Sequence, residues 1–205
     1  MKIKNYSVRG LGPAMLLGAV LLFSCGPGAG TAKAEGTGTL KLPTLGGPLV
    51  VLTESQADLV CYIEPTEELK NSLTPEEYEV LVQAGTEPPF QNAFWNNHRE
   101  GIYVDRIDGT PLFASSTKFD SGTGWPSFWS PIDQDAVVLV EDRSYGMYRI
   151  EVRSKSSGGH LGHVFKDGPK PTGLRYCINS ASLAFVPKEE MEAKGYGKLL
   201  VELGL

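Results

Sequence analysis

The sequence predicts a mainly antiparallel β domain with short helices in front. Short strand-like segments follow one another from residue 101 to residue 187, separated by clusters of Gly, Asp, Ser and Pro. The high content of Gly (24) and Pro (14) favours turns over long helices. Neither a strand–helix–strand alternation nor a glycine-rich phosphate loop occurs in the sequence, which disfavours a parallel nucleotide-binding sheet.

The helices are expected on either side of the strand-rich region. Thr74-Pro75-Glu76-Glu77 combines a capping threonine, a proline at the first helical position and the glutamate of a capping box. This helix is expected to stop at Gly85. A second short helix is predicted at 66–71 and a last one at 188–193.

Seven segments have the short, apolar and β-branched character of strands. The segments at 136–141 and 147–152 flank Arg143-Ser144-Tyr145-Gly146 and predict a hairpin. The other expected strands are Tyr103-Val104, Pro111–Phe113, His163–Phe165, Arg175–Asn179 and Ser182–Phe185.

The amino terminus has the pattern of a bacterial lipoprotein signal. A positive start precedes thirteen uncharged residues, 11–23, a run that is short for a membrane span. The run ends in Leu22-Phe23-Ser24-Cys25, which resembles a lipobox, whose cysteine becomes acylated. The alternative is an ordinary secretion signal with an incidental cysteine.

These features predict three regions. Residues 1–24 are expected to be the signal peptide, 25–45 a flexible tether that begins at the lipidated Cys25, and 46–205 the folded domain. Loss of the signal changes the net charge from −5 to −8, because three basic residues leave with it, which disfavours a nucleic-acid partner. We expect an exported, membrane-anchored lipoprotein that faces the periplasm or the cell surface, where thiols need a dedicated electron source.

Apart from Cys25, the thiols are Cys61 and Cys177. Three cysteines build neither a disulfide scaffold nor a four-cysteine metal site. Strand alternation places Arg175, Cys177 and Asn179 on one face. A cation and an amide donor beside a thiol favour the reactive thiolate, so Cys177 is a candidate nucleophile. The alternative is a buried structural cysteine.

Two further segments carry candidate site residues. His160 and His163 lie three apart among glycines and are interpreted as proton donors or as partners of the thiolate. They also suit a metal, although further ligands are not apparent nearby, and one of them is alternatively structural. In the loop 118–129, Trp125 is expected to face a ligand, and Phe128 is either a substrate contact or a core residue.

Four segments in register resemble the B-type methionine sulfoxide reductases over residues 73–187. They are Gly85-Thr86-Glu87-Pro88-Pro89-Phe90, Lys118–Phe128, Gly159–Phe165 and Arg175–Leu183. The resemblance implies a fold of two antiparallel sheets. It also implies reduction of the R epimer of methionine sulfoxide, free or within proteins.

Carried over by position, the resemblance gives each candidate a role. Cys177 attacks the sulfoxide sulfur and keeps the oxygen as a sulfenic acid. His163, with His160 beside it, supplies protons to the oxygen, Asn179 is a polar residue of the same pocket, and Trp125 packs against the S-methyl group. The remaining candidate substrate contacts are Phe128 and Arg175.

This sequence departs from the family pattern at two sites. Where many members hold a structural zinc on two Cys-x-x-Cys pairs, it has Asp105 and Asp108, then Ser154 and Ser157. Serine is a poor zinc ligand, so we expect no zinc and no other cofactor. Where many relatives carry the recycling cysteine, it has Thr123. Either Cys61 resolves the sulfenic acid, or an external thiol does and Cys61 is an inert buried thiol.

We therefore expect a monomeric repair enzyme for exported proteins, with a thioredoxin-like or other thiol reductant as partner. Three alternatives stay open. Cys177, His163 and Asn179 have the residue types of a cysteine hydrolase, and a non-catalytic module would bind methionine-containing peptides with a structural cysteine. A metal carrier built on the two histidines is a third alternative.

Overall fold

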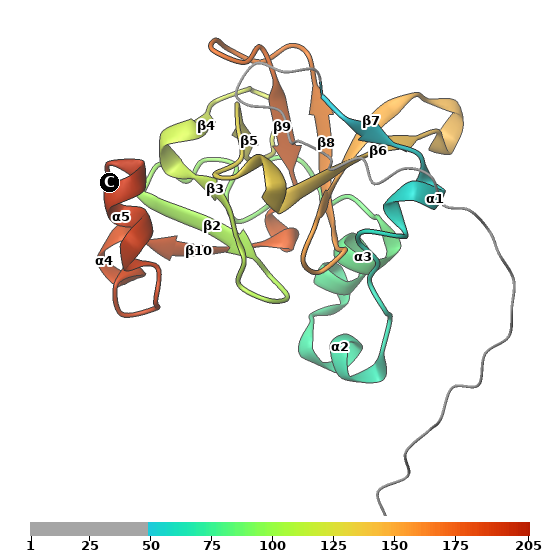
Figure 1. Cartoon of the computed structure of the whole chain (residues 1–205), viewed down its shortest axis with the longest axis horizontal. Coiled ribbons are helices and arrows are strands. Elements are labelled where there is room, and N and C mark those ends of the chain that lie inside the picture. Colours follow the sequence, from blue (N-terminus) through green and yellow to red (C-terminus); the bar gives the residue numbers. More distant parts are fainter. Residues whose placement is uncertain (1–48) are drawn as a thin grey trace, which may run out of the picture. The chain divides into compact units, whose positions relative to one another are not determined.

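Residues 49–205 are described by a computed structural model, in which two sheets form the body of the domain (Figure 1). The large sheet has the strand order β1-β6-β7-β8-β9-β5-β4, and the small sheet has the order β10-β2-β3. Only β1 and β6 run parallel among the described strand pairs. The expected mainly antiparallel fold with two sheets is confirmed.

Each expected strand segment overlaps a strand of the structure. The strands of the large sheet are β1 (Val51–Leu52), β4 (Lys118–Phe119), β5 (Ser127–Phe128), β6 (Val137–Asp142), β7 (Arg149–Ser154), β8 (His160–Phe165) and β9 (Arg175–Ile178). Those of the small sheet are β2 (Gly101–Asp105), β3 (Pro111–Ala114) and β10 (Leu183–Pro187). The three strands that the sequence did not predict have two residues each, too few to show an alternating pattern.

The longest described helix begins where the local sequence predicts it. α3 (Pro75–Gln83) starts at a complete capping box, in which the Glu77 amide donates to Thr74 Oγ1 at 3.2 Å. Its left-handed terminal residue is Ala84, with φ of 53°, and not Gly85 as expected. Gly85 follows it in a tight place, since a Cβ there would lie 3.0 Å from the carbonyl oxygen of Glu79.

The other helices are short. They are α1 (Glu54–Ala57), α2 (Glu67–Ser72), α4 (Lys188–Met191) and α5 (Gly197–Leu203). Within residues 49–205 there are also four 3-10 turns: η1 (Ser115–Thr117), η2 (Gln134–Ala136), η3 (Ser144–Gly146) and η4 (Ser180–Ser182). α2 and α4 match the predicted segments, whereas α1 and α5 were not predicted. None of the described helices is long and apolar enough to cross a membrane.

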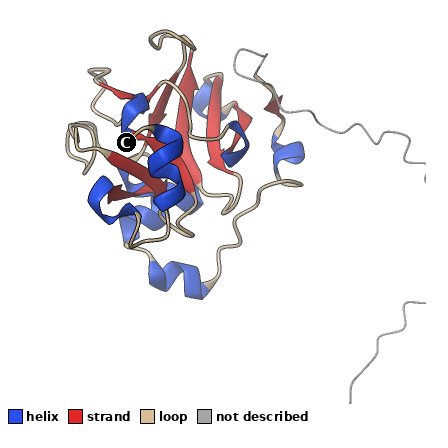
Figure 2. Ribbon diagram, turned by 60° about the vertical axis from the view of Figure 1, so that its left-hand side comes forward, coloured by secondary structure: helices blue, strands red, loops and turns tan. Residues whose placement is uncertain are grey.

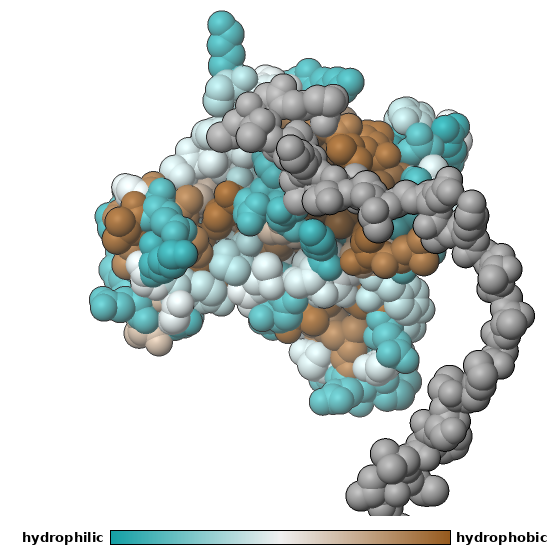
Figure 3. All heavy atoms as spheres, viewed as in Figure 1, coloured by the Kyte–Doolittle hydropathy of each residue, from teal (hydrophilic) through white to brown (hydrophobic). Residues whose placement is uncertain are grey.

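The main core lies between the two sheets. Tyr103, Leu112 and Phe113 of the small sheet pack against apolar side chains of the large one. Phe113 stacks on Phe128 with a centroid distance of 4.5 Å. A second cluster fills the other face of the small sheet beneath α4 and α5 (Figure 2). Hydrophobic surface is visible at the end of the molecule that these two helices form (Figure 3). The sheets therefore supply a rigid frame for the face of the large sheet that carries the polar candidates.

The predictions for the signal peptide (1–24), for lipidation of Cys25 and for the tether (25–45) fall on residues outside the described part of the chain.

Candidate active site

Cys177 occupies an inner strand of the large sheet. In β9 it lies directly opposite His163 of β8 on one side and Ser127 of β5 on the other. Directly opposed residues of antiparallel strands share a face and have neighbouring side chains. The sequence therefore brings the predicted nucleophile and one predicted proton donor together, on the face opposite the main core.

A β-bulge places the second histidine on the same face. Residues three apart in a regular strand point to opposite sides. Between β7 and β8, however, Val152 pairs with Gly162 and the next residue, Arg153, pairs with His160. Leu161 is the extra residue and is buried in the main core. The rings of His160 and His163 consequently lie 5.5 Å apart, edge to face.

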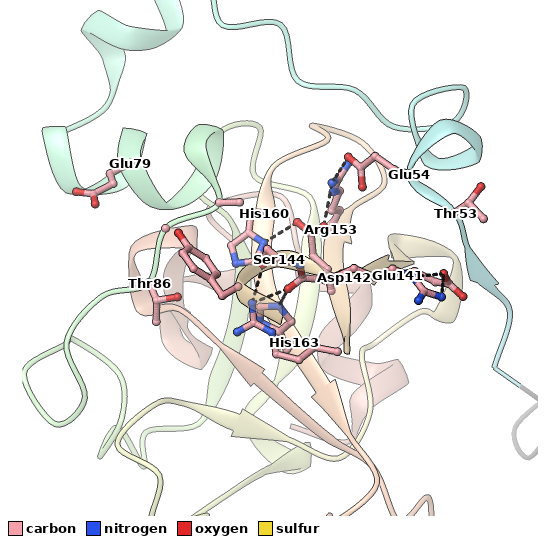
Figure 4. A pocket seen from close by; sticks show the side chains of 16 residues that line it. Thr53, Glu54, Glu79, Thr86, Glu141, Asp142, Ser144, Arg153, His160 and His163 are labelled. Carbon is pink, nitrogen blue, oxygen red and sulfur yellow. Dashed lines mark hydrogen bonds and ion pairs between the residues drawn. The ribbon is translucent and has the colours of Figure 1, made fainter. Parts of the chain in front are cut away.

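Each histidine is held by a carboxylate (Figure 4). His160 Nδ1 lies 2.7 Å from Glu151 Oε1, and His163 Nε2 lies 2.8 Å from Asp142 Oδ2. Burial lowers the pKa of His163 despite the nearby Asp142 carboxylate. Burial alone would raise the pKa of Asp142, but hydrogen bonds from Ser144 and His163, with the charge of Arg149, hold it well below its ordinary value. His163 is therefore neutral at pH 7 beside an ionised Asp142.

Burial has the largest effect on the pKa of the Cys177 thiol. It raises the pKa of Cys177, although a contact with Thr123 and the charge of Arg175 act in the opposite direction. Arg175 also donates two hydrogen bonds, of 2.9 and 2.8 Å, to Asp167, which engages part of its charge. The expectation that polar neighbours favour the thiolate is met by Thr123 and Arg175, which act to lower the pKa of Cys177, but burial outweighs them and the net shift is upward. Deprotonation has to accompany the reaction.

Asn179 and Trp125 are oriented by one residue that the sequence analysis did not single out. The Glu87 amide donates to Asn179 Oδ1 at 3.3 Å, and Trp125 Nε1 donates to the Glu87 carbonyl at 3.0 Å. Asn179 Nδ2 also donates to the Leu161 carbonyl at 3.1 Å. Only the position of Glu87 inside the Gly-Thr-Glu-Pro-Pro segment hinted at a role, because its partners lie far away in sequence.

Phe128 is not a substrate contact. Its side chain is completely buried between Phe113 and Tyr103, within the main core. A residue in the two-residue strand β5 alternates with Ser127, which faces the thiol, so Phe128 must point the other way. The assignment of Phe128 to substrate binding is corrected to core packing, the alternative that the sequence had left open.

The structure separates Cys61 from Cys177, and both are free thiols. Cys61 is 4% exposed and packs with Ala57 of α1 against Val138 and Val140 of β6. Two strands, β7 and β8, lie between β6 and the strand of Cys177. Burial raises the pKa of Cys61 as well. The nearest candidate position for a recycling group is Thr123, whose Oγ1 lies 3.8 Å from Cys177 Sγ.

At the position of the zinc-binding pairs, the donor set does not fit zinc. Asp105 is buried and accepts hydrogen bonds from the Ser157 hydroxyl at 2.7 Å and from the Ile107 amide at 2.8 Å. The Asp108 carboxylate accepts the Thr110 amide at 2.8 Å. The oxygens of Asp105 are therefore already engaged within the fold, and serine hydroxyls are poor zinc ligands.

A cleft of about 830 Å³ opens beside the histidines. His160, His163, Asp142 and Arg153 line it, together with Glu79 and Thr86, which lie to the left of the histidines in Figure 4. Three arginines of the cleft pair with its carboxylates, with N–O distances of 3.1 Å for Arg143–Glu141, 2.6 Å for Arg149–Asp142 and 2.6 Å for Arg153–Glu54. Tyr145, with a 91% exposed side chain, stands at the rim.

Comparisons with known proteins identify the family. The SelR domain matches residues 73–187. "Peptide methionine sulfoxide reductase MsrB" of Staphylococcus haemolyticus is 54% identical over 132 residues, which are 64% of this chain and 93% of that protein. "Peptide methionine sulfoxide reductase MsrA/MsrB" of Vibrio cholerae serotype O1 is 51% identical over 146 residues, 71% of this chain but only 39% of that longer protein. The SelR match spans more than half of this chain. The chain therefore belongs to the SelR family, the B-type methionine sulfoxide reductases, and is an oxidoreductase.

Proposed function

We propose that this protein reduces the R epimer of methionine sulfoxide to methionine with Cys177 as the nucleophile. The observation that carries the proposal is the position of Cys177 between His163 and Ser127 on one face of the sheet. Asn179, two residues further along the chain, and Trp125, two residues before Ser127, are both hydrogen-bonded to Glu87. Asn179 Nδ2 uses one hydrogen for Leu161 and has a second for a substrate oxygen. The half-buried Trp125 ring offers an apolar surface for the S-methyl group.

In the proposed reaction, the sulfur of Cys177 attacks the sulfoxide sulfur. The S–O bond breaks, methionine leaves, and the oxygen stays on Cys177 as a sulfenic acid. The cysteine sulfur is oxidised and the sulfoxide reduced, so no further electrons are needed in this step. His163, with His160 behind it, takes the proton of the Cys177 thiol as the sulfur attacks and passes it to the departing oxygen, while Thr123 and Ser127 stabilise the charge that develops on the sulfur.

An external thiol is proposed to restore Cys177. It attacks the sulfenic acid, releasing water and forming a mixed disulfide, and a second thiol then frees the cysteine. The burial of Cys61 and its separation from Cys177 by two strands support this route over resolution by Cys61. The hydrogen-bonded Asp105 supports a domain that works without structural zinc.

Protein-bound methionine sulfoxide is the proposed substrate. The lining of the cleft includes His163, which pairs with Cys177 in the sheet, but not Cys177, Asn179 or Trp125, so the cleft adjoins the reacting thiol. Its volume of about 830 Å³ leaves room for the polypeptide that flanks an oxidised methionine. The paired arginines leave it without a strong preference for a free anion. With the lipoprotein-like amino terminus, this supports repair of oxidised exported proteins by a membrane-anchored enzyme in the periplasm or at the cell surface.

A single-turnover reaction tests the proposal. The protein without reductant receives the R or the S epimer, and the intact mass and the methionine formed are measured. Methionine from the R epimer alone, with one oxygen gained by the protein, supports the proposal. A loss of two hydrogens points to a Cys61–Cys177 disulfide instead. Consumption of neither epimer with both thiols still reduced refutes the reductase and favours the hydrolase or the peptide-binding module.

A further inference from the structure

Glu87 is the point at which both substrate-facing side chains meet. Its amide donates to Asn179 Oδ1 and its carbonyl accepts from Trp125 Nε1. Asn179 follows β9 and Trp125 precedes β5, so these two residues belong to different segments of the site. A displacement of Glu87 would therefore move the amide and the indole together.

The carboxylate of Glu87 is what holds this backbone in place. Its side chain is only 4% exposed, and its two oxygens accept the amides of Ser180 and Ala181, the latter at 2.8 Å. These amides begin the 3-10 turn η4, directly after Asn179. Glu87 is thus hydrogen-bonded to residues 179–181 in two ways. Its carboxylate accepts the backbone amides of Ser180 and Ala181, and its own backbone amide donates to the Asn179 side chain.

Glu87 is a buried acid that forms no ion pair with a cation among residues 49–205, and its hydrogen bonds explain how it is accommodated. Burial raises the pKa of Glu87, while the backbone amides of Ser180 and Ala181 act to lower it. Keeping a carboxylate in such a place is costly unless its bonds are made well. A neutral side chain of the same shape would satisfy the packing but not both amides, since an amide group offers only one acceptor oxygen.

We propose that Glu87 is a positioning residue for the sulfoxide: it fixes the free N–H of Asn179 and the face of Trp125 at the distances that the reaction requires. The proposal rests on the proposed reductase function. Glu87 does not touch the substrate, so its effect must pass through Asn179 and Trp125. Coupling between Glu87 and Asn179 is therefore the property to measure.

The test is a double-mutant cycle on the full-length protein with R-methionine sulfoxide and dithiothreitol. Glu87→Gln, Asn179→Ala and the double variant are compared in kcat/KM, and Glu189→Gln, an exposed glutamate of α4, is the control. Circular dichroism and urea midpoints confirm that each variant is folded. We expect Glu87→Gln to lower kcat/KM about tenfold or more in the wild-type background, but by less than about threefold once Asn179 is alanine.

Each outcome is decisive. The positioning role is overturned if the fold losses in kcat/KM of the two single variants multiply in the double variant. It is also overturned if Glu87→Gln is as active as the control. A merely structural role lowers the urea midpoint without coupling to Asn179 and likewise overturns it. If the unmodified protein reduces neither epimer, the reductase function itself fails and the role of Glu87 with it, whereas an active wild type confines any failure to this inference.

Discussion

Replacing Gly162 by alanine should separate β8 from β9 at the nucleophile. A Cβ at residue 162 would lie 2.1 Å from the carbonyl oxygen of Cys177, while real contacts of this kind are not closer than 3.0 Å. The strands must therefore move apart by about 1 Å, which takes ladder hydrogen bonds outside their normal range of roughly 2.7–3.2 Å. The loss of two such buried bonds predicts a destabilisation of about 2–5 kcal/mol and a large fall in reductase activity.

A matched glycine separates this steric effect from the intrinsic cost of a positive φ. Gly173 has φ of +71° and open space around its missing Cβ, so Gly173→Ala should cost only about 1–2 kcal/mol. Urea unfolding of both variants at pH 7 measures the difference, and turnover of R-methionine sulfoxide measures the effect on the site. Equal losses of stability for the two variants would refute the close-approach explanation.

Three further predictions concern the thiols, the histidine and the metal. Cys61→Ser should leave turnover with dithiothreitol unchanged. The Thr123→Cys variant should form a disulfide between residues 123 and 177 after one turnover, which non-reducing peptide mapping detects. Absence of this disulfide would show that the 3.8 Å contact between residues 123 and 177 does not suit a recycling thiol. Because burial lowers the pKa of His163 below its unfolded value near 6.5, the folded state binds fewer protons. The contribution of His163 to the free energy of unfolding is present above pH 6.5 and is lost as the pH falls through the pKa of the folded state. His163→Gln should therefore lose less unfolding free energy than the wild type between pH 7 and 5 in urea titrations, and an equal loss contradicts this. Purified protein should contain no zinc by elemental mass spectrometry, and its unfolding midpoint should not respond to a chelator; a midpoint that falls on chelation would reveal a metal site.

Local chemistry made much of this fold predictable. Thr74, Pro75 and Glu77 act within one turn, so the start of α3 follows from adjacent residues. The alternation that joins Cys177 to Arg175 is equally local. Such short-range rules also predicted the hairpin of β6 and β7, because strand character and turn residues lie next to each other.

The parts that sequence did not predict depend on contacts between distant segments. The parallel pairing of β1 with β6 joins residues such as Val51 and Leu139 and has no local signature. The bulge at Leu161, which turns His160 toward His163, is defined only by the partner strand. Burial of Cys177 depends on the packed structure, and for this reason the sequence pointed to a thiolate where the structure favours a thiol.

The hydrogen-bonded group around Asp105 has a consequence for an enzyme that repairs oxidative damage. Hydrogen bonds between the side-chain oxygens of Asp105, Ser154 and Ser157 join the end of β2 to the end of β7 and the turn that follows it. A cluster of four cysteines at such a place would itself be a target for peroxide or hypochlorous acid, and its oxidation would release the metal and loosen the fold. The hydrogen-bonded group of Asp105, Ser154 and Ser157 contains no sulfur that these oxidants could attack. At this position, the scaffold is inert to the damage that Cys177 is proposed to reverse.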